Sequence, residues 1–198
     1  MISKSAVVAL GLAAATFALP AAAQLRATGF YLGGSIGQAK AKDFCDGVGG
    51  PGVSCDDKDT AWKLFAGYQF HPNVAVELGY ADLGKAKASG SGAEVSDEAT
   101  AWDLTAVASW PLVNQFSIYG RFGGYHGTVK SKASVTGLGS ASEDKSTTDI
   151  TFGVGARYDI TRNFGIRAEW QRYADMKDAF DEKSNVDVMS IGVLYRFQ

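Results

Sequence analysis

The chain is poor in cysteine, proline and histidine, has almost no net charge, and contains no long apolar run after its first residues. Its 198 residues include two cysteines, two histidines and four prolines, and 19 basic residues nearly balance 21 acidic ones to give a net charge of −2. The absence of a basic excess argues against a nucleic-acid partner, and the scarcity of proline argues against a proline-rich linker. The mean hydropathy of −0.05 would place the mature chain among soluble proteins in a sliding-window plot. Within parts of the chain, however, apolar residues alternate with small or polar ones, and this alternation favours a class other than soluble proteins.

The first 23 residues have the features of a secretory signal peptide. Lys4 precedes an uncharged run, Pro20 breaks it, and three alanines then offer a small-residue cleavage site. The alternative is a retained transmembrane helix, for which the run is just long enough. Its alanine richness and Pro20 favour cleavage. We expect a signal peptide over residues 1–23 and a single domain over residues 24–198.

Eight segments alternate apolar residues with small, polar or charged ones. In the last of them Met189, Ile191 and Val193 share one parity, while Ser190 and Arg196 lie on the other. Successive side chains of a strand point to opposite faces, so this period of two indicates strands with one apolar face. We expect strands at residues 29–41, 60–70, 74–83, 99–110, 116–127, 149–160, 164–173 and 186–197.

The connections between these segments alternate between short and long. Residues 71–73, 111–115 and 161–163 are short turns, whereas 42–59, 84–98, 128–148 and 174–185 are long polar loops. Short turns at one rim and long loops at the other are typical of outer-membrane barrels. The sequence therefore predicts an all-β fold, an eight-stranded antiparallel up-and-down transmembrane β-barrel in a Gram-negative outer membrane.

Charged residues in the middle of the segments lie on the parity opposite to the apolar residues, and Asp82 and Arg172 share the apolar parity only at the loop ends. A basic side chain facing lipid at mid-membrane costs about 2–4 kcal/mol, which explains the sorting. The alternative is a soluble eight-stranded barrel or sandwich, which has the same alternation, but its outer face should carry more charge than this glycine-, alanine- and serine-rich parity. We expect an ion-pair network in a narrow lumen, formed by Lys63, Glu77, Asp103, Arg121, Arg157, Arg167, Glu169 and Arg196.

Aromatic residues gather at the ends of the segments, on the apolar parity. This is the placement of the aromatic girdles of membrane barrels, which lie at the two membrane–water interfaces. The expected girdle residues are Trp110, Tyr195 and Phe197 near the short turns, and Trp62, Tyr80, Trp102 and Trp170 near the long loops.

Three stretches resemble the membrane domain of OmpA and its relatives: HPNVAVELGY at 71–80, IYGRFGG at 118–124 and MSIGVLYRF at 189–197. The resemblance implies that Glu77 pairs with Arg167 and plugs the lumen. It also places Val107 and Arg157 where the family has alternative ionic partners, so a switching gate is not expected. The peptidoglycan-binding domain that follows the barrel in OmpA is not expected after Phe197, which is penultimate where the family's insertion signal ends in an aromatic residue.

Cys45 and Cys55 lie in the first long loop. After a signal peptide, in an oxidising compartment, a disulfide is the expected state. A metal site is the alternative, but two cysteines without a nearby histidine make a poor one. The serine-, glycine- and alanine-rich loops at 86–92 and 131–142 are expected to be exposed and mobile, and they contain no binding motif.

We expect a structural or cell-surface role without catalysis, cofactor or metal. The alternatives are a narrow channel and a lipid A-modifying enzyme, for which His126, Ser131 and Asp149 would be the nominal catalytic residues. The expected partners are outer-membrane lipids including lipopolysaccharide, the barrel-assembly machinery and periplasmic chaperones during biogenesis, and a host, phage or matrix ligand at the extracellular loops. The protein is expected to be a monomer.

Overall fold

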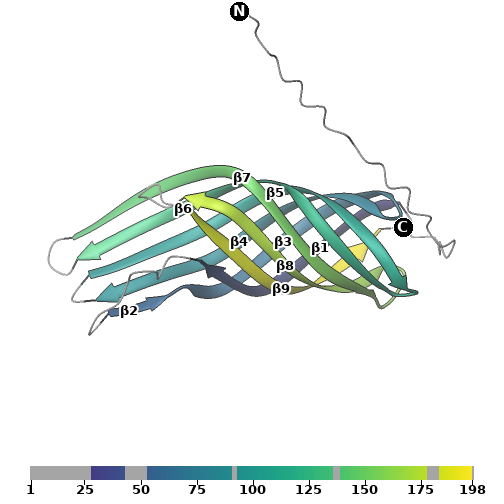
Figure 1. The fold of residues 1–198 in the computed structure, drawn as a ribbon, viewed down its shortest axis with the longest axis horizontal. Helices are drawn as coiled ribbons and strands as arrows, with labels where there is room; N and C mark the ends of the chain where they lie inside the picture. Colours follow the sequence, from purple (N-terminus) through teal and green to yellow (C-terminus); the bar gives the residue numbers. More distant parts are fainter. Residues whose placement is uncertain (1–27, 43–52, 91–92, 136–138, 178–182, 198) are drawn as a thin grey trace, which may run out of the picture.

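The computed structural model describes residues 28–42, 53–90, 93–135, 139–177 and 183–197. The predicted signal peptide lies outside these residues. Within them the chain forms only β-strands, which Figure 1 shows as one strongly tilted, elongated sheet. The strands are β1 (Gly29–Ala41), β2 (Val53–Asp56), β3 (Lys58–His71), β4 (Val74–Gly90), β5 (Ala93–Val113), β6 (Phe116–Val135), β7 (Gly139–Asp159), β8 (Phe164–Lys177) and β9 (Lys183–Arg196).

The sheet closes on itself to form an eight-stranded antiparallel barrel. The order β4–β3–β1–β9–β8–β7–β6–β5 is completed by pairing of β4 with β5, and β1 is paired with β9 from Tyr31↔Arg196 to Ala41↔Val186. The short strand β2 pairs only with the outer part of β4 and precedes β3 along the same edge, so it adds no ninth position to the ring. The predicted fold class is confirmed, and closure leaves no unpaired edge in the membrane.

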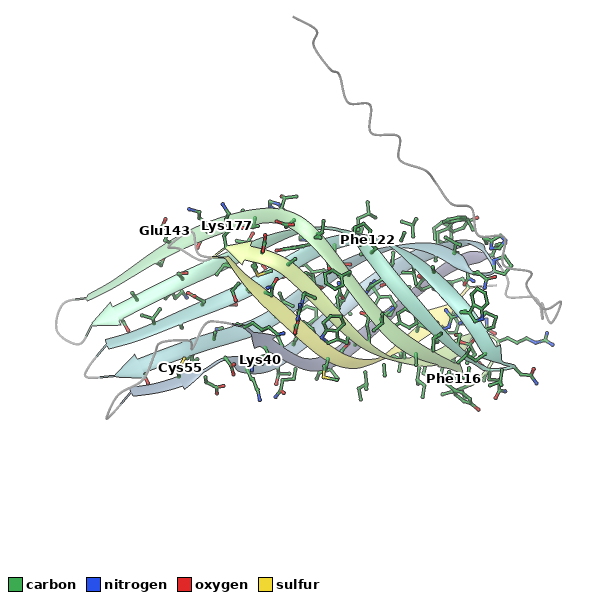
Figure 2. The ribbon with its side chains drawn as sticks, viewed as in Figure 1. Lys40, Cys55, Phe116, Phe122, Glu143 and Lys177 are labelled. Atoms are coloured by element: carbon green, nitrogen blue, oxygen red, sulfur yellow. The ribbon has the colours of Figure 1, made fainter. Side chains whose placement is uncertain are left out.

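The long loops are where the sequence interpretation was wrong. Most of the residues assigned to them continue the strands: β4 and β5 stay paired to Gly90↔Ala93, and β6 and β7 to Val135↔Gly139. The segments 86–92 and 131–142, expected to be mobile loops, are mostly strand. In Figure 2 Glu143 and Cys55 lie at the end reached by these extensions, and Phe116 lies at the short-turn end. Beyond the bilayer both faces of a hairpin meet water, so the alternation that marks a membrane strand is lost.

Two bulges lie where strands leave the membrane toward the long hairpins. The pairing of β4 with β5 shifts register between Asp82 and Lys85, and that of β8 with β9 shifts between Tyr173 and Met176. Gly84, with φ of 76°, and Asp175, with φ of 52°, lie in these bulges. Gly84 allows the left-handed backbone without cost, and its N–H donates to Asp82 Oδ1 at 2.9 Å. In β4 and β8, the residues after the bulge face the lumen on the opposite parity from the residues before it.

The distribution of apolar side chains is inverted relative to a water-soluble protein. Leu64, Phe122 and Val154 are 58%, 61% and 60% exposed on the outer face, whereas Glu77 and Asp103 are each only 1% exposed inside. Figure 2 shows Phe122 projecting outward from the barrel wall. A soluble barrel would bury the first set and expose the second. The outer face therefore matches hydrocarbon, and the inner face supplies its own polar partners.

No helix that is long and apolar enough to cross a membrane occurs in the described part of the chain.

Candidate functional site: the filled lumen and the outer rim

Glu77 on β4 is at the centre of the lumen and is held by two arginines. Arg167 Nη1 donates to Glu77 Oε2 at 2.9 Å, and Arg121 Nη2 donates to Oε1. The hydroxyl of Tyr31 donates to Oε2 at 3.2 Å. The Glu77–Arg167 pair that the family resemblance implied is thus present, and Arg121 is a second cation on the same carboxylate.

Arg121 also joins Glu77 to a second carboxylate. Its Nη1 donates to Glu169 Oε1 at 2.6 Å, and the Tyr119 hydroxyl donates to Oε2 of the same glutamate at 2.7 Å. Arg121 is on β6 and Glu169 on β8, two positions apart in the ring. The guanidinium of Arg167 lies over the Phe65 ring at 3.4 Å from its centroid, a favourable cation–π arrangement.

Lys63 on β3 forms a fourth ion pair in this layer. Its Nζ donates to Asp103 Oδ2 at 2.7 Å and to Gln171 Oε1 at 3.0 Å. Tyr173 donates to the same Asp103 oxygen at 3.0 Å. Three cations (Lys63, Arg121 and Arg167) therefore balance three anions (Glu77, Asp103 and Glu169) in one buried layer. Buried charges that are paired and hydrogen-bonded in this way avoid the penalty of an isolated ion.

Apolar layers lie on both sides of the charged one. Toward the long hairpins, one buried cluster contains Ala39, Ala61, Ala81, Leu83, Ala101, Tyr125, Val129, Tyr173, Met176 and Val186. Toward the short turns, a second contains Tyr31, Phe65, Ala75, Val107, Tyr119 and Leu194. Side chains fill an eight-stranded barrel, and here they do so in three successive layers.

Two of the predicted network residues do not join the central layer. Arg157 Nε lies 3.4 Å from Asp159 Oδ1, and Arg196 Nη2 lies 2.6 Å from the same oxygen. Arg196 also donates to the backbone carbonyl of Arg162 at 3.4 Å. The expected single network is thus divided into a central layer and a smaller group at the short-turn mouth, centred on Asp159.

Sequence reasoning missed Asp159 and the neutral members of the network, Tyr31, Thr105, Gln171 and Tyr173. Their signal was parity, because all five are odd-numbered, as are the lumen-facing charged residues Lys63, Glu77, Asp103, Arg121, Arg157, Arg167 and Glu169. Gln171 is the best example: it accepts from Lys63 and from Arg121, and its Nε2 donates to Thr151 at 2.9 Å. A parity search that included uncharged polar residues would have found it.

The predicted girdle residues lie on the outer face in two bands. Trp62, Tyr80 and Trp102 form a continuous row across β3, β4 and β5, with ring centroids 5.7 and 4.9 Å apart. Trp170 belongs to the same band on β8, and Trp110, Tyr195 and Phe197 lie at the short-turn end. Tyr195 and Phe197 contact each other edge to face at 5.2 Å.

The residues considered for catalysis are not brought together. His126 Nδ1 lies 2.8 Å from Thr148 Oγ1 on the outer face. Asp149 and Ser131 are on the opposite parity of their strands, and Asp149 Oδ1 accepts from the Ile150 N–H at 2.7 Å. A Ser–His–acid arrangement requires the three side chains to share one face.

An ionic group lies beyond the loop-side girdle, outside the membrane-spanning part of the barrel. Arg172 donates twice to Asp187, at 2.6 and 2.8 Å, and Lys42 Nζ lies 3.2 Å from Asp187 Oδ2. The hydrogen bonds from Arg172, with a further contribution from Lys42, lower the pKa of Asp187. The same bonds raise the pKa of Arg172, which also lies over Trp170.

The predicted disulfide falls partly outside the described residues. Cys55, in β2, is not a free thiol, but Cys45 is not among the residues described. The pairing of Cys45 with Cys55 stays a prediction.

The barrel, its apolar exterior and its filled lumen define the class of small eight-stranded outer-membrane proteins of Gram-negative bacteria. The model of the OmpA-like transmembrane domain matches residues 25–198, and the chain belongs to that family. It is 29% identical to outer membrane protein A of Shigella flexneri and 30% identical to that of Escherichia fergusonii, covering 98% of this chain and 56% of each relative. The chain thus spans about half the length of these relatives.

Solved structures show the same fold. Neisserial surface protein A matches with a TM-score of 0.56 at 16% identity, covering 85% of this chain and 97% of that one. Ail of Yersinia pestis, in complex with the heparin analogue sucrose octasulfate, matches with a TM-score of 0.51 at 22% identity, covering 85% and 99%. Likeness at this level concerns the fold alone.

Proposed function

We propose that this protein is a non-conducting, non-catalytic barrel that supports outer-membrane integrity and presents its long hairpins for contact with a ligand outside the cell. The observation that carries the proposal is the combination of a filled lumen with projecting hairpins. On β6, nine residues follow His126, at the level of the loop-side girdle, before the strand ends at Val135. At about 3.4 Å per residue this is roughly 30 Å of strand beyond the membrane.

The ligand class is part of the proposal. Rim segments on a rigid scaffold are the usual site of recognition. Because the structural neighbour Ail is described with a heparin analogue, a sulfated polysaccharide is one ligand to test, alongside host cells, phage and matrix proteins. The lumen, with three stacked layers of side chains, supports a structural role better than transport.

The test is a deletion strain complemented with hairpin variants. Residues 85–98 or 129–145 would be replaced by a short turn, with scrambled hairpins of equal length and composition as matched controls. We expect the deletion to increase detergent sensitivity and to lower adhesion to heparin-coated surfaces and host cells. Hairpin replacement should lower adhesion while leaving detergent resistance at the wild-type level. A deletion strain that matches wild type in both assays would overturn the proposal.

A further inference from the structure

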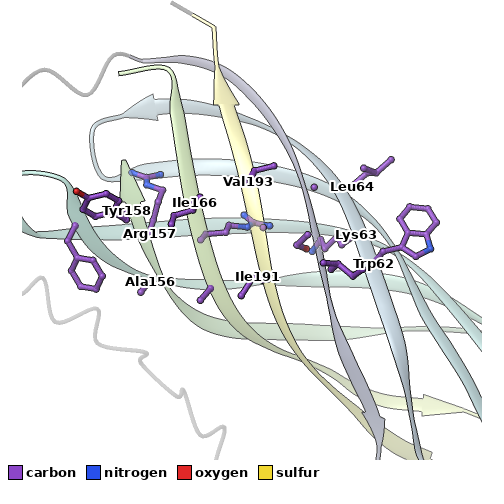
Figure 3. Close-up of a pocket in the computed structure, with 16 residues that line it drawn as sticks. Trp62, Lys63, Leu64, Ala156, Arg157, Tyr158, Ile166, Ile191 and Val193 are labelled. Carbon is purple, nitrogen blue, oxygen red and sulfur yellow. The ribbon is translucent and has the colours of Figure 1, made fainter. Parts of the chain in front are cut away.

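A large groove lies on the lipid-facing surface of the described structure. It has a volume of about 730 Å³ and crosses β7, β8, β9, β1 and β3. Figure 3 shows its walls: Tyr158, Ile166, Val193 and Leu64 lie along one side, and Ala156, Ile191 and Trp62 along the other. The groove is wide because Gly34, Ala156 and Ala168 take positions where the outer face otherwise carries large side chains.

The register explains its course. One wall follows the paired residues Tyr158↔Ile166↔Val193↔Gly34↔Leu64, and the other follows Ala156↔Ala168↔Ile191↔Ile36↔Trp62. The two walls are two residues apart along each strand, which is about 7 Å, and the groove runs across four strand intervals, about 19 Å. Because the strands are tilted, it climbs from Tyr158 near the short turns to Trp62 in the loop-side girdle.

The width of the groove limits which kind of molecule can bind in it. An α-helix with its side chains is about 10–12 Å across, too wide to enter between the walls. A single hydrocarbon chain is narrow enough, and the lining is almost wholly apolar. The groove therefore fits an acyl chain that enters from the outer leaflet.

A pair of lysines lies directly above the upper end. On β1 and β3 the outward-facing pairs beyond Ile36↔Trp62 are Gln38↔Thr60 and then Lys40↔Lys58. Like charges directly opposite each other destabilise a sheet. Lys40 Nζ lies 3.3 Å from Asp57, but the side chain of Lys58 has no ion-pair partner among the described residues. The nearby Asp56 accepts from the backbone N–H of Lys58 rather than from its ammonium group.

We propose that the groove and the Lys40–Lys58 pair form a binding site for a phosphorylated glycolipid of the outer leaflet, lipid A. One acyl chain lies in the groove, Gln38 and Thr60 face the sugar, and a phosphate lies between the two ammonium groups and relieves their repulsion. Basic groups beside an apolar surface recognise anionic lipid headgroups in this way. The inference depends on the outer-membrane location and goes beyond the adhesive role proposed above.

The test measures lipid retention by native mass spectrometry of the detergent-solubilised protein. The probes are hexa-acylated bisphosphorylated lipid A, its dephosphorylated form, and phosphatidylglycerol. The variants are the Lys40→Gln/Lys58→Gln double substitution, which removes the headgroup contacts, and Ala168→Phe, which fills the groove. The matched controls are Lys130→Gln, an exposed rim lysine on the opposite side of the barrel, and Ala106→Phe, a small outward residue outside the groove. Heat-modifiable gel mobility confirms that each variant is folded.

We expect wild type to bind bisphosphorylated lipid A better than the other two lipids. Since each lysine near a headgroup contributes about a fivefold change in affinity, the double lysine variant should bind lipid A about 25-fold more weakly. Ala168→Phe should weaken the binding of both forms of lipid A, and both control variants should bind lipid A as wild type does. Equal retention by wild type and the double lysine variant would overturn the proposal, as would equal binding of phosphatidylglycerol. A dimer that Ala168→Phe abolishes would assign the groove to a second copy instead. None of these outcomes depends on adhesion.

Discussion

Arg121 and Glu169 meet across the lumen, with Nη1 and Oε1 2.6 Å apart, although their strands are not neighbours in the sheet. Because Arg121 also bonds Glu77 on β4, one guanidinium connects three strands through the barrel interior. These contacts are additional to the backbone hydrogen bonds of the wall. They make Arg121 the residue on which the central layer most depends.

Replacing Arg121 with methionine should therefore destabilise the barrel strongly. The change leaves Glu77 with one arginine and Glu169 without its cation, and breaking a buried pair in this way costs about 3–5 kcal/mol. The measurement is the free energy of unfolding by urea in lipid vesicles. The variant Arg121→Met/Glu169→Gln should recover part of the loss, because it removes the carboxylate that has lost its cation. Arg162→Met, at an exposed turn, should change stability by no more than about 0.5 kcal/mol, and a similar value for Arg121→Met would contradict the central role.

The filled lumen should conduct poorly, even when one layer is thinned. In planar bilayers we expect wild type to show no steady conductance steps. Tyr173→Ala should behave in the same way, because removing this ring from the loop-side layer leaves Phe65 and Tyr119 in the opposite layer. Large and stable steps in wild type would support the channel alternative. Conductance steps in Tyr173→Ala but not in wild type would show that the loop-side layer alone closes the lumen.

Gly123 should not tolerate a side chain, whereas its neighbour Gly124 should. A Cβ at Gly123 would overlap the carbonyl oxygen of Leu104 and come within 2.7 Å of Thr105 Cα, both on the adjacent strand. At Gly124 the nearest atom is 3.8 Å away. We expect Gly123→Ala to lower the free energy of unfolding by about 1–3 kcal/mol, as overpacking does. Gly124→Ala serves as the matched control, and equal stability of the two variants would argue against this close approach.

The rim group around Asp187 should make the outer end of the β8–β9 hairpin sensitive to acid. The pKa of Asp187 is lowered from an ordinary value of 3.8 by hydrogen bonds from Arg172 and Lys42. A lowered carboxyl pKa gives stability that is complete above the unfolded-state pKa and is lost as pH falls through the folded-state value. Hydrogen exchange in residues 171–177 and 184–188 should therefore accelerate below about pH 4. In Asp187→Asn this acid dependence should be absent, and identical pH profiles for the two proteins would refute the assignment.

Strand identity in the membrane could be predicted because lipid imposes a strict rule on it. Residues 29–41 were predicted as a strand and form β1 with the same bounds. Lipid-facing residues such as Leu64 and Ile166 must be apolar, and lumen residues such as Glu77 must not meet hydrocarbon. Parity therefore assigns each residue to a face. Where water meets both faces, as in the outer part of β6, no such rule applies, and the strand extensions were missed.

Partner choice within the lumen could not be read from parity. Arg157 shares a face with Glu77 but contacts Asp159, because register and strand tilt place it at the mouth rather than in the central layer. The lipid-facing groove was missed for a similar reason. Gly34 and Ala168 are far apart in sequence and become parts of one surface only when the pairing of β1, β9 and β8 is known.

The pairing of β1 with β9, which closes the barrel, limits how the chain can insert into the membrane. These are the first and last strands of the barrel along the chain, yet each supplies the other's hydrogen-bonding edge. Until β9 arrives, β1 and β8 each keep an open side that a bilayer cannot tolerate. Insertion must therefore be close to all-or-none. Any factor that accompanies the chain to the membrane has to cover the open edge of β1 until β9 pairs with it.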